Sequence, residues 1–287
     1  MIHLGIIASS LSLPTGEAFG NLSDFDFTTS QEFTFTNASV SGSGLGISFK
    51  TDGTKMFLAS SNPNELVEYD LSTAWDITTA SYSAKVTSPF QFRDLYIDSS
   101  GTRLFGNNST TIYKHSLSTA WDITSLNSIP DQQVTIAVGV LQSLAFSDDG
   151  LYFVGGSPQS PTIDGTQYID PLVSAQLSTA WDLSSLPLVS SGNWNAISLQ
   201  TLTGFNTVPN GLSIVNNGST IIVNDNGKDR VYQFDLSTAY DVSTATQVDF
   251  EANNISNNGS MTIRSDNPSE IYILGFGDKR VLQYSKT

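Results

Sequence analysis

The chain has 287 residues, of which 39% are apolar and 14% charged, with a formal net charge of −15 and no cysteine. Its 12 basic residues are scattered, which argues against nucleic acid as a partner, since phosphates are held by clustered Lys and Arg. The acidic chain is not attracted to anionic membranes, and without cysteine it forms neither disulfides nor thiolate metal sites.

Residues 1–20 have no counterpart elsewhere in the chain and are expected to form an N-terminal arm. A short apolar run, LGII at residues 4–7, has no basic residue before it, so it makes a poor signal peptide; secretion by this route remains an alternative. No stretch approaches the roughly 20 apolar residues of a membrane span. An arm of this kind is expected to be mobile until it docks on a partner protein or a symmetry mate.

Internal repeats dominate the rest of the chain. One phrase occurs four times: LSTAWDI at residues 71–77 and 117–123, LSTAWDL at 177–183 and LSTAYDV at 236–242. A strand–turn–strand phrase precedes each copy, and a fifth such phrase starts at Met261. The turns fall at Gly53, Gly101, Gly150, Gly218 and Asn267, so successive turns are 48, 49, 68 and 49 residues apart. This period is typical of four-stranded propeller blades and predicts an all-β, five-bladed β-propeller.

Each unit is expected to contain four strands, which in the first unit are residues 47–49, 56–58, 66–70 and 81–87. The repeated phrase connects the third strand to the fourth. Its Asp is expected to fix a turn by bonding backbone N–H groups, and its aromatic residue to fill the gap between neighbouring sheets. These residues are Asp76, Asp122, Asp182 and Asp241, with Trp75, Trp121, Trp181 and Tyr240.

The two ends of the chain carry complementary parts of one unit. Residues 21–29 align with residues 71–79, matching Phe25-Asp26-Phe27 to Trp75-Asp76-Ile77, and residues 281–284 align with a third strand. Residues 31–36 are therefore predicted to be the outer strand of the last blade, which would close the ring and remove exposed sheet edges. Residues 21–287 then form a single propeller domain. A linear array or open β-solenoid with the same period is the alternative.

The phrase FKTDGTKMFLAS…LVEYDLS resembles the YVTN- and NHL-type propeller units, over nearly all of residues 21–287. The LSTAWDI connector is similar to repeats in virion and tail-associated proteins of bacteriophages, marine ones especially, and in surface proteins of their hosts. The resemblance implies a binding or structural module on a virion surface, as a capsid decoration, tail or fibre-associated protein that contacts the host. A secreted or cell-surface location is the alternative. No catalytic residue is transferred by the resemblance.

Catalytic motifs are sparse. The two histidines, His3 and His115, form no metal-spaced pair, and His115 occupies a strand position held elsewhere by Tyr69 and Phe234. A Ser-His-Asp triad needs an oriented histidine. A propeller glycosidase needs a carboxylate pair at a cleft, and none of the six glutamates falls on a predicted innermost strand. The chain is therefore expected not to be an enzyme.

No cofactor is expected, with calcium as the open alternative. Asp148-Asp149 and Asp225-Asn226-Gly227 offer the hard oxygen ligands that calcium prefers. The same residues are also common in tight turns.

Propeller topology divides the loops between two faces. The turns at Gly53 and its equivalents and the LSTAWDI connectors lie on one, here named the connector face. The second-to-third-strand loops and the crossings between blades lie on the other, the loop face, where residues 155–174 and 192–210 vary most. Because binding in repeat folds concentrates where loops vary on a rigid scaffold, the candidate contact residues are Arg93, Asp164, Tyr168, Trp194, Phe205, Lys228 and Arg280. Alternatively these loops cover blade edges or pack on a neighbouring subunit.

Two functions remain in view. One is a structural or binding component of a phage particle, anchored to other virion proteins through residues 1–20. The other is a free carbohydrate-binding propeller, which should repeat its site in every blade, whereas the variable loops do not repeat.

Overall fold

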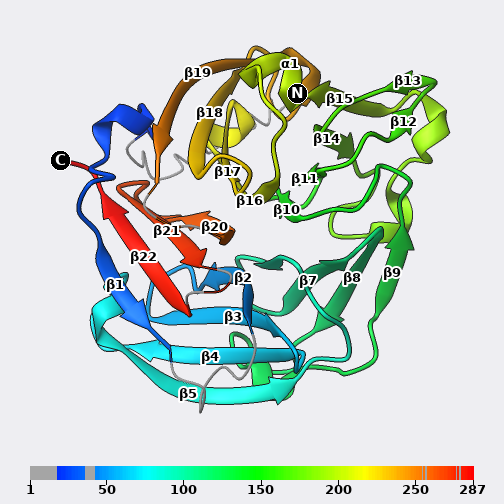
Figure 1. Ribbon diagram of the computed structural model, residues 1–287. Coiled ribbons are helices and arrows are strands. Elements are labelled where there is room, and N and C mark those ends of the chain that lie inside the picture. The colour runs from blue at the N-terminus through cyan, green and yellow to red at the C-terminus, as the bar shows by residue number, and fades with distance from the viewer. Residues whose placement is uncertain (1–17, 36–42, 254, 256, 276, 278) are drawn as a thin grey trace, which may run out of the picture.

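The computed structural model describes residues 18–35, 43–253, 255, 257–275, 277 and 279–287. Five four-stranded antiparallel sheets surround a central axis (Figure 1). This arrangement confirms the prediction of an all-β, five-bladed propeller. The first strand of each sheet lies innermost, and the innermost strands of neighbouring blades contact one another around the axis.

The blades follow in chain order, each written from the inside outward. Blade 1 contains β2 (Ser43–Phe49), β3 (Lys55–Ser61), β4 (Glu65–Leu71) and β5 (Ala80–Thr87). Blade 2 contains β6 (Leu95–Ile97), β7 (Arg103–Asn108), β8 (Thr111–Ser116) and β9 (Gln132–Thr135). Blade 3 contains β10 (Ser143–Phe146), β11 (Tyr152–Gly156), β14 (Pro171–Gln176) and β15 (Trp194–Ser198). Blade 4 contains β16 (Pro209–Val215), β17 (Thr220–Asp225), β18 (Arg230–Leu236) and β19 (Ala245–Ala252). Blade 5 contains β20 (Asn258–Ile263), β21 (Glu270–Gly275), β22 (Arg280–Ser285) and β1 (Gln31–Thr34).

The remaining elements are short. A hairpin of β12 (Thr162–Ile163) and β13 (Thr166–Gln167) extends blade 3, and α1 (Leu199–Thr203) lies in the crossing to blade 4. The 3-10 turns are η1 (Leu22–Asp24), η2 (Ile77–Thr79), η3 (Ile123–Ser125), η4 (Leu183–Ser185), η5 (Val189–Ser191), η6 (Asn216–Gly218) and η7 (Val242–Thr244). Within the described part of the chain, no helix is long and apolar enough to cross a membrane.

Ring closure occurs through β1, as predicted. Strand β1 pairs antiparallel with β22, with Gln31 opposite Gln283 and Thr34 opposite Arg280. The strand ends at Thr34, although the backbone N–H of Phe35 still donates to the carbonyl of Lys279. Residue 36, the last of the predicted strand, lies outside the described residues. Blade 5 is thus built from both ends of the chain.

The alignment proposed for the N-terminal connector is wrong by five residues. Gly20, not Phe25, matches Trp75: both have a positive φ, +75° and +67°, and each stands two residues before a 3-10 turn. The η1 turn contacts the outer strands of blade 4, as η7 contacts those of blade 3. The misalignment has a local cause, because Asp26 accepts a hydrogen bond from the backbone N–H of Thr28, 2.8 Å, just as Asp76 does from Thr78.

Residues before the expected domain boundary also belong to the propeller. Phe19 is fully buried in a core cluster with Leu22 and Phe25, and its ring stacks on that of Phe25 at 5.3 Å. Its backbone N–H donates to Asn216 Oδ1 in blade 4. The arm that was expected to span residues 1–20 is therefore reduced to residues that precede Phe19, and residues 1–17 lie outside the described range.

The repeated phrase has a packing role in each of the four blades that contain it. In blade 3, the ring of Trp181 lies against Gly150, so that a Cβ at Gly150 would overlap the ring, and Trp181 N–H donates to the Gly150 carbonyl at 3.0 Å. The same pairs form between Gly53 and Trp75, Gly101 and Trp121, and Gly218 and Tyr240. The connector rings also reach the preceding blade, as Trp75 does at 6.3 Å from Tyr272 of blade 5.

The connector aspartates cap the turns that follow. Asp76, Asp122, Asp182 and Asp241 each accept a hydrogen bond from the backbone N–H two residues later, at 2.9–3.0 Å. In these four turns, and in η1 at the N-terminal end, the first backbone N–H donates to a side chain of the preceding blade. These bonds join Leu22 to Gln233, Ile77 to Gln283, Ile123 to Glu68, Leu183 to Gln132 and Val242 to Ser174. One type of bond thus fastens all five junctions.

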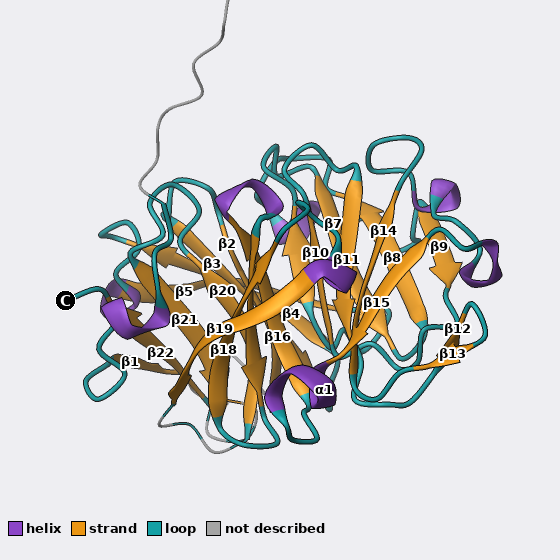
Figure 2. Cartoon of the chain, turned by 90° about the horizontal axis from the view of Figure 1, so that it is seen from above, coloured by secondary structure: helices purple, strands orange, loops and turns teal. Residues whose placement is uncertain are grey.

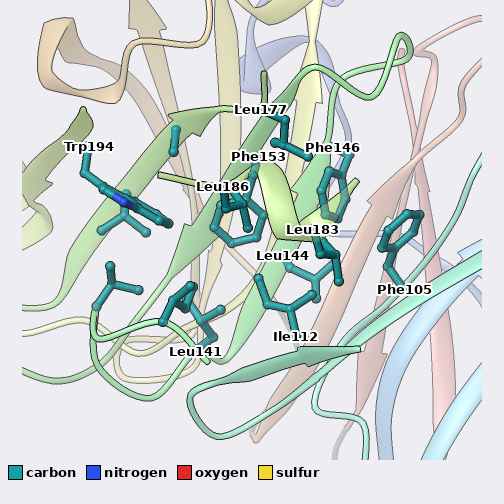
Figure 3. Packing of buried hydrophobic residues seen from close by; sticks show 14 of the residues in the cluster. Phe105, Ile112, Leu141, Leu144, Phe146, Phe153, Leu177, Leu183, Leu186 and Trp194 are labelled. Carbon is teal, nitrogen blue, oxygen red and sulfur yellow. The ribbon is translucent and has the colours of Figure 1, made fainter. Parts of the chain in front are cut away.

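Apolar side chains fill the space between blades. Figure 3 shows the cluster between blades 2 and 3, where Phe105 and Phe146 lie 4.6 Å apart and Phe153 and Leu183 are fully buried. Burying one such side chain stabilises the fold by roughly 2–3 kcal/mol. The ring is therefore a packed scaffold that can hold loops in place.

Candidate ligand-binding site

On the loop face, the beginnings of the inner strands surround a cavity of about 230 Å³. This cavity, named the central mouth, receives residues from all five blades. Its polar lining residues are Arg93, Gln142, Asn210, Asn226 and Asn257. The cavity is a consequence of ring closure, because five radial sheets converge there.

Buried polar atoms without a hydrogen-bond partner gather at this mouth. Among the described residues they include Arg93 Nε, Asn210 Oδ1 and Asn226 Oδ1. Arg93 Nη1 already donates to Gln142 Oε1 at 2.8 Å, and Asn210 Nδ2 to the carbonyl of Asn258 at 2.8 Å. Leaving a buried polar atom unpaired costs about 1–3 kcal/mol. A polar ligand that donates to the amide oxygens and accepts from Arg93 would recover that free energy, and hydroxyl groups can do both.

Directly behind the mouth, Asp94 ties three blades together. It is buried and accepts hydrogen bonds from Leu95 N–H at 2.9 Å, Leu144 N–H at 3.0 Å and Ser260 Oγ at 2.5 Å. Burial raises the pKa of Asp94 to about 7, while these hydrogen bonds act in the opposite direction. Since both carboxylate oxygens are engaged by the protein, we assign Asp94 a structural role. No sequence pattern marked this residue.

Two of the predicted contact residues, Phe205 and Lys228, meet near the outer strand of blade 4. Lys228 Nζ lies 5.6 Å from the centre of the Phe205 ring, and the Arg230 guanidinium lies 5.5 Å from Phe205 and 4.8 Å from Phe250. Both rings are 45% exposed. Phe205, Lys228, Arg230 and Phe250 are together named the blade 4 rim. The loops that carry Phe205 and Lys228 also contribute Val208 and Asn226 to the lining of the mouth. Aromatic faces beside cations suit ligands that combine a ring with a negative charge.

The other predicted contact residues lie apart from the mouth, except Arg93, which lines it. Asp164 borders a separate cavity of about 830 Å³ beside β9 and accepts a hydrogen bond from Gly192 N–H. Tyr168 is partly buried and packs against the core cluster of blades 2 and 3. Arg280 pairs with Glu32 at 3.3 Å in blade 5.

Trp194 requires a correction. It was predicted as a surface contact, but it is 6% exposed and lies within the core cluster of blades 2 and 3 (Figure 3). Its indole N–H donates to the carbonyl of Pro187 at 2.9 Å. The residue begins β15 and turns its ring inward, because strand residues alternate between the two faces of a sheet.

The two segments considered for calcium differ. In the first, Asp149 Oδ1 accepts from Ser147 Oγ at 2.6 Å and Leu151 N–H at 2.9 Å, which is the bonding of an ordinary turn. In the second, Asp225 Oδ1 accepts from the N–H groups of Val208 and Gly227, while Asp225 Oδ2 has no partner among the described residues. No group of three or more His, Asp or Glu residues gathers within the described ranges.

His115 is a packed residue. It is fully buried, its Nδ1 lies 2.8 Å from the carbonyl oxygen of Asn127, and its ring lies 5.8 Å from that of Phe92. Burial lowers its pKa below the usual value, so the neutral ring is favoured. His3 lies outside the described residues.

Comparisons with known proteins support the fold alone. No family model matches the chain, and no curated protein matches its sequence. Among solved structures, the β-propeller domain of Cps50 (Swd1) from Myceliophteria thermophila is 10% identical, with a TM-score of 0.50 over 92% of this chain and 100% of that domain.

Two further solved structures have TM-scores below that value. A functionally unknown protein from Desulfotomaculum acetoxidans is 11% identical with a TM-score of 0.45, and the WD40 domain of Pan2 from Neurospora crassa is 12% identical with a TM-score of 0.43. They match 81% and 85% of this chain, which spans 62% and 63% of theirs.

Proposed function

We propose that this protein is a non-enzymatic binding propeller displayed on the surface of a bacteriophage particle, with the loop face turned outward. The observation that carries the binding role is the central mouth, where a closed ring of five blades holds buried polar atoms that have no partner within the described part of the chain. A rigid scaffold with such atoms loses little conformational entropy when a ligand binds.

The particle location rests on the connector. Its LSTAWDI phrase resembles repeats in virion and tail-associated proteins, and the structure uses that phrase to join blades on the face opposite the mouth. The connector face would then be the side turned toward the particle. Residues 1–17 remain the proposed anchor to other virion proteins or to a second copy.

The non-enzymatic part is supported by how the buried carboxylates are held. Asp94 receives three hydrogen bonds from the protein itself, and Asp225 receives two backbone N–H groups on one oxygen. A general acid or base must be within hydrogen-bond reach of its substrate. Asp94 is buried, and its hydrogen bonds hold together the inner strands of three blades.

The particle assignment is tested with antibodies against the purified protein. Density-purified particles from the source culture are probed by immunoblot and by immunogold electron microscopy. We expect label on intact particles, at the capsid, tail or fibres. Recovery of the protein only in particle-free fractions would overturn the assignment while leaving the binding role open.

A carbohydrate-binding propeller that acts free of any particle is the second candidate. The blade 4 rim favours it, because exposed aromatic rings beside cationic side chains suit a saccharide. The site occurs in one blade only within the described residues, unlike the repeated site that a lectin with five equivalent blades would have.

A further inference from the structure

Two buried carboxylates lie on the loop face, where blades 3 and 4 meet. Asp170 is 7% exposed and Asp225 is fully buried. Asp170 Oδ2 accepts a hydrogen bond from Thr207 N–H at 2.9 Å, and Asp225 Oδ1 accepts one from Val208 N–H at 2.6 Å. Because Thr207 and Val208 are consecutive, both carboxylates lie against the same short stretch of backbone.

The charge of this pair is not balanced by the protein. Within the described ranges, no Lys or Arg nitrogen forms an ion pair with either carboxylate. Burial raises the pKa of Asp225, whereas the hydrogen bonds from the N–H groups of Val208 and Gly227 and the charge of Lys228 lower it, and the charge of Asp170 adds a smaller upward contribution. A buried carboxylate that lacks a counter-charge is costly and is normally paired or bound to metal.

Two of the residues at this junction carry unpartnered oxygen atoms. Asp225 Oδ2 and Thr207 Oγ1 are buried and have no hydrogen-bond partner among the described residues. Thr207 is 2% exposed, and its own N–H is bound to Asp170. Two carboxylates and a hydroxyl, all of them oxygen donors, therefore lie on or against residues 207–208, in a region that excludes most water.

We propose that Asp170, Thr207 and Asp225 bind a divalent calcium ion at the junction of blades 3 and 4. Calcium takes six to eight oxygen ligands in flexible geometry, so backbone carbonyls and water would complete the shell. The ion would neutralise the carboxylate pair and join the two blades. It would also stabilise the loops that bring Val208 and Asn226 to the central mouth. This inference goes beyond the proposed function and does not depend on particle display.

A shared proton is the competing explanation. Two neighbouring buried carboxylates can lower their repulsion when one of them is protonated. The two explanations differ in their response to calcium and in the effect of removing one charge.

The test uses the full chain at pH 7. Calcium content is measured by elemental analysis after dialysis against calcium and desalting, and the melting temperature is measured in calcium and in EDTA. We expect about one ion per chain and a melting temperature about 5 °C higher in saturating calcium. Asp225→Asn should abolish both effects, and Thr207→Val, which keeps both charges, should weaken binding by about tenfold.

Asp148→Asn is the control, since Asp148 is an exposed turn residue in the other segment considered for calcium. That variant should bind calcium like the parent. An absence of bound ion and of any calcium-dependent melting shift in the parent chain would overturn the proposal. If Asp225→Asn then melts higher than the parent, the shared proton explains the pair. Loss of calcium binding in Asp148→Asn would likewise contradict the assignment.

Discussion

The two faces of the propeller differ in what their residues do. On the connector face, the same glycine–aromatic pair and the same capped turn recur in four blades, and their bonds are satisfied within the protein. On the loop face no segment recurs among the residues that the structure describes. Figure 2 shows α1 and the β12–β13 hairpin on the same side of the molecule, and both belong to segments without a counterpart in other blades.

This difference separates stability from recognition. The repeated residues pack neighbouring blades together. They recur because every blade contacts its neighbour in the same way. The irregular loops do not have to meet that requirement, and buried polar atoms that lack partners among the described residues lie there, at the central mouth. Changes on the connector face should therefore affect folding, and changes on the loop face should affect binding.

The largest effect is expected from opening the ring. Deleting residues 1–35 removes β1 together with Phe19, Leu22 and Phe25, which form the fifth connector and its core. The loss should be on the order of 5 kcal/mol or more, and the exposed edge of β22 should promote aggregation. Deleting residues 1–17 keeps all of these contacts. Thermal unfolding compares the two truncations with the full chain, and equal melting temperatures for both would contradict the closure argument.

A pair of glycines tests the two faces directly. Gly150 and Gly165 both have positive φ, +70° and +81°, but Gly150 lies under the Trp181 ring whereas nothing lies within 4 Å of a Cβ at Gly165. Replacing Gly165 with Ala should cost about 1 kcal/mol for the backbone alone. Gly150→Ala adds a steric clash and should cost about 3 kcal/mol or more. Urea denaturation measures the free energy of unfolding of both variants. Similar losses would show that the Trp181 side chain moves aside without cost and would contradict the expected difference between the two faces.

The smallest effect on stability is expected at the blade 4 rim. Phe205→Ala and Lys228→Ala change residues that are exposed, so the free energy of unfolding should shift by about 0.5 kcal/mol. If the rim binds an acidic saccharide, each change should weaken binding to a galacturonic acid trimer by about tenfold, measured by calorimetry. Lys50→Ala on the connector face is the control with the same charge change, and maltotriose is the neutral probe. No binding by the parent chain to either probe would remove the carbohydrate-binding alternative.

Much of the architecture was predictable from local patterns. The spacing of the turns between Gly53 and Asn267 indicated five blades, and the incomplete units at the two ends indicated that a strand near residue 31 closes the ring. These predictions succeeded because a propeller repeats one local solution, in which strand alternation and turn residues recur with each blade. The candidate site was predicted only in part. Arg93 lines the mouth, and Phe205 and Lys228 meet in the blade 4 rim, whereas Asp164 and Arg280 lie elsewhere.

By itself, the amino-acid sequence determined the number of blades, the turn glycines, the connector aromatics and the strand that closes the ring. Tertiary structure alone decided that Gly20 rather than Phe25 corresponds to Trp75, that Trp194 turns into the core and that Asp94 joins three blades. It also placed Asp170 and Asp225 against two consecutive residues of one loop. The physical reason is that periodicity and turn chemistry act between near neighbours, whereas these contacts join residues of different blades and exist only once the ring has closed.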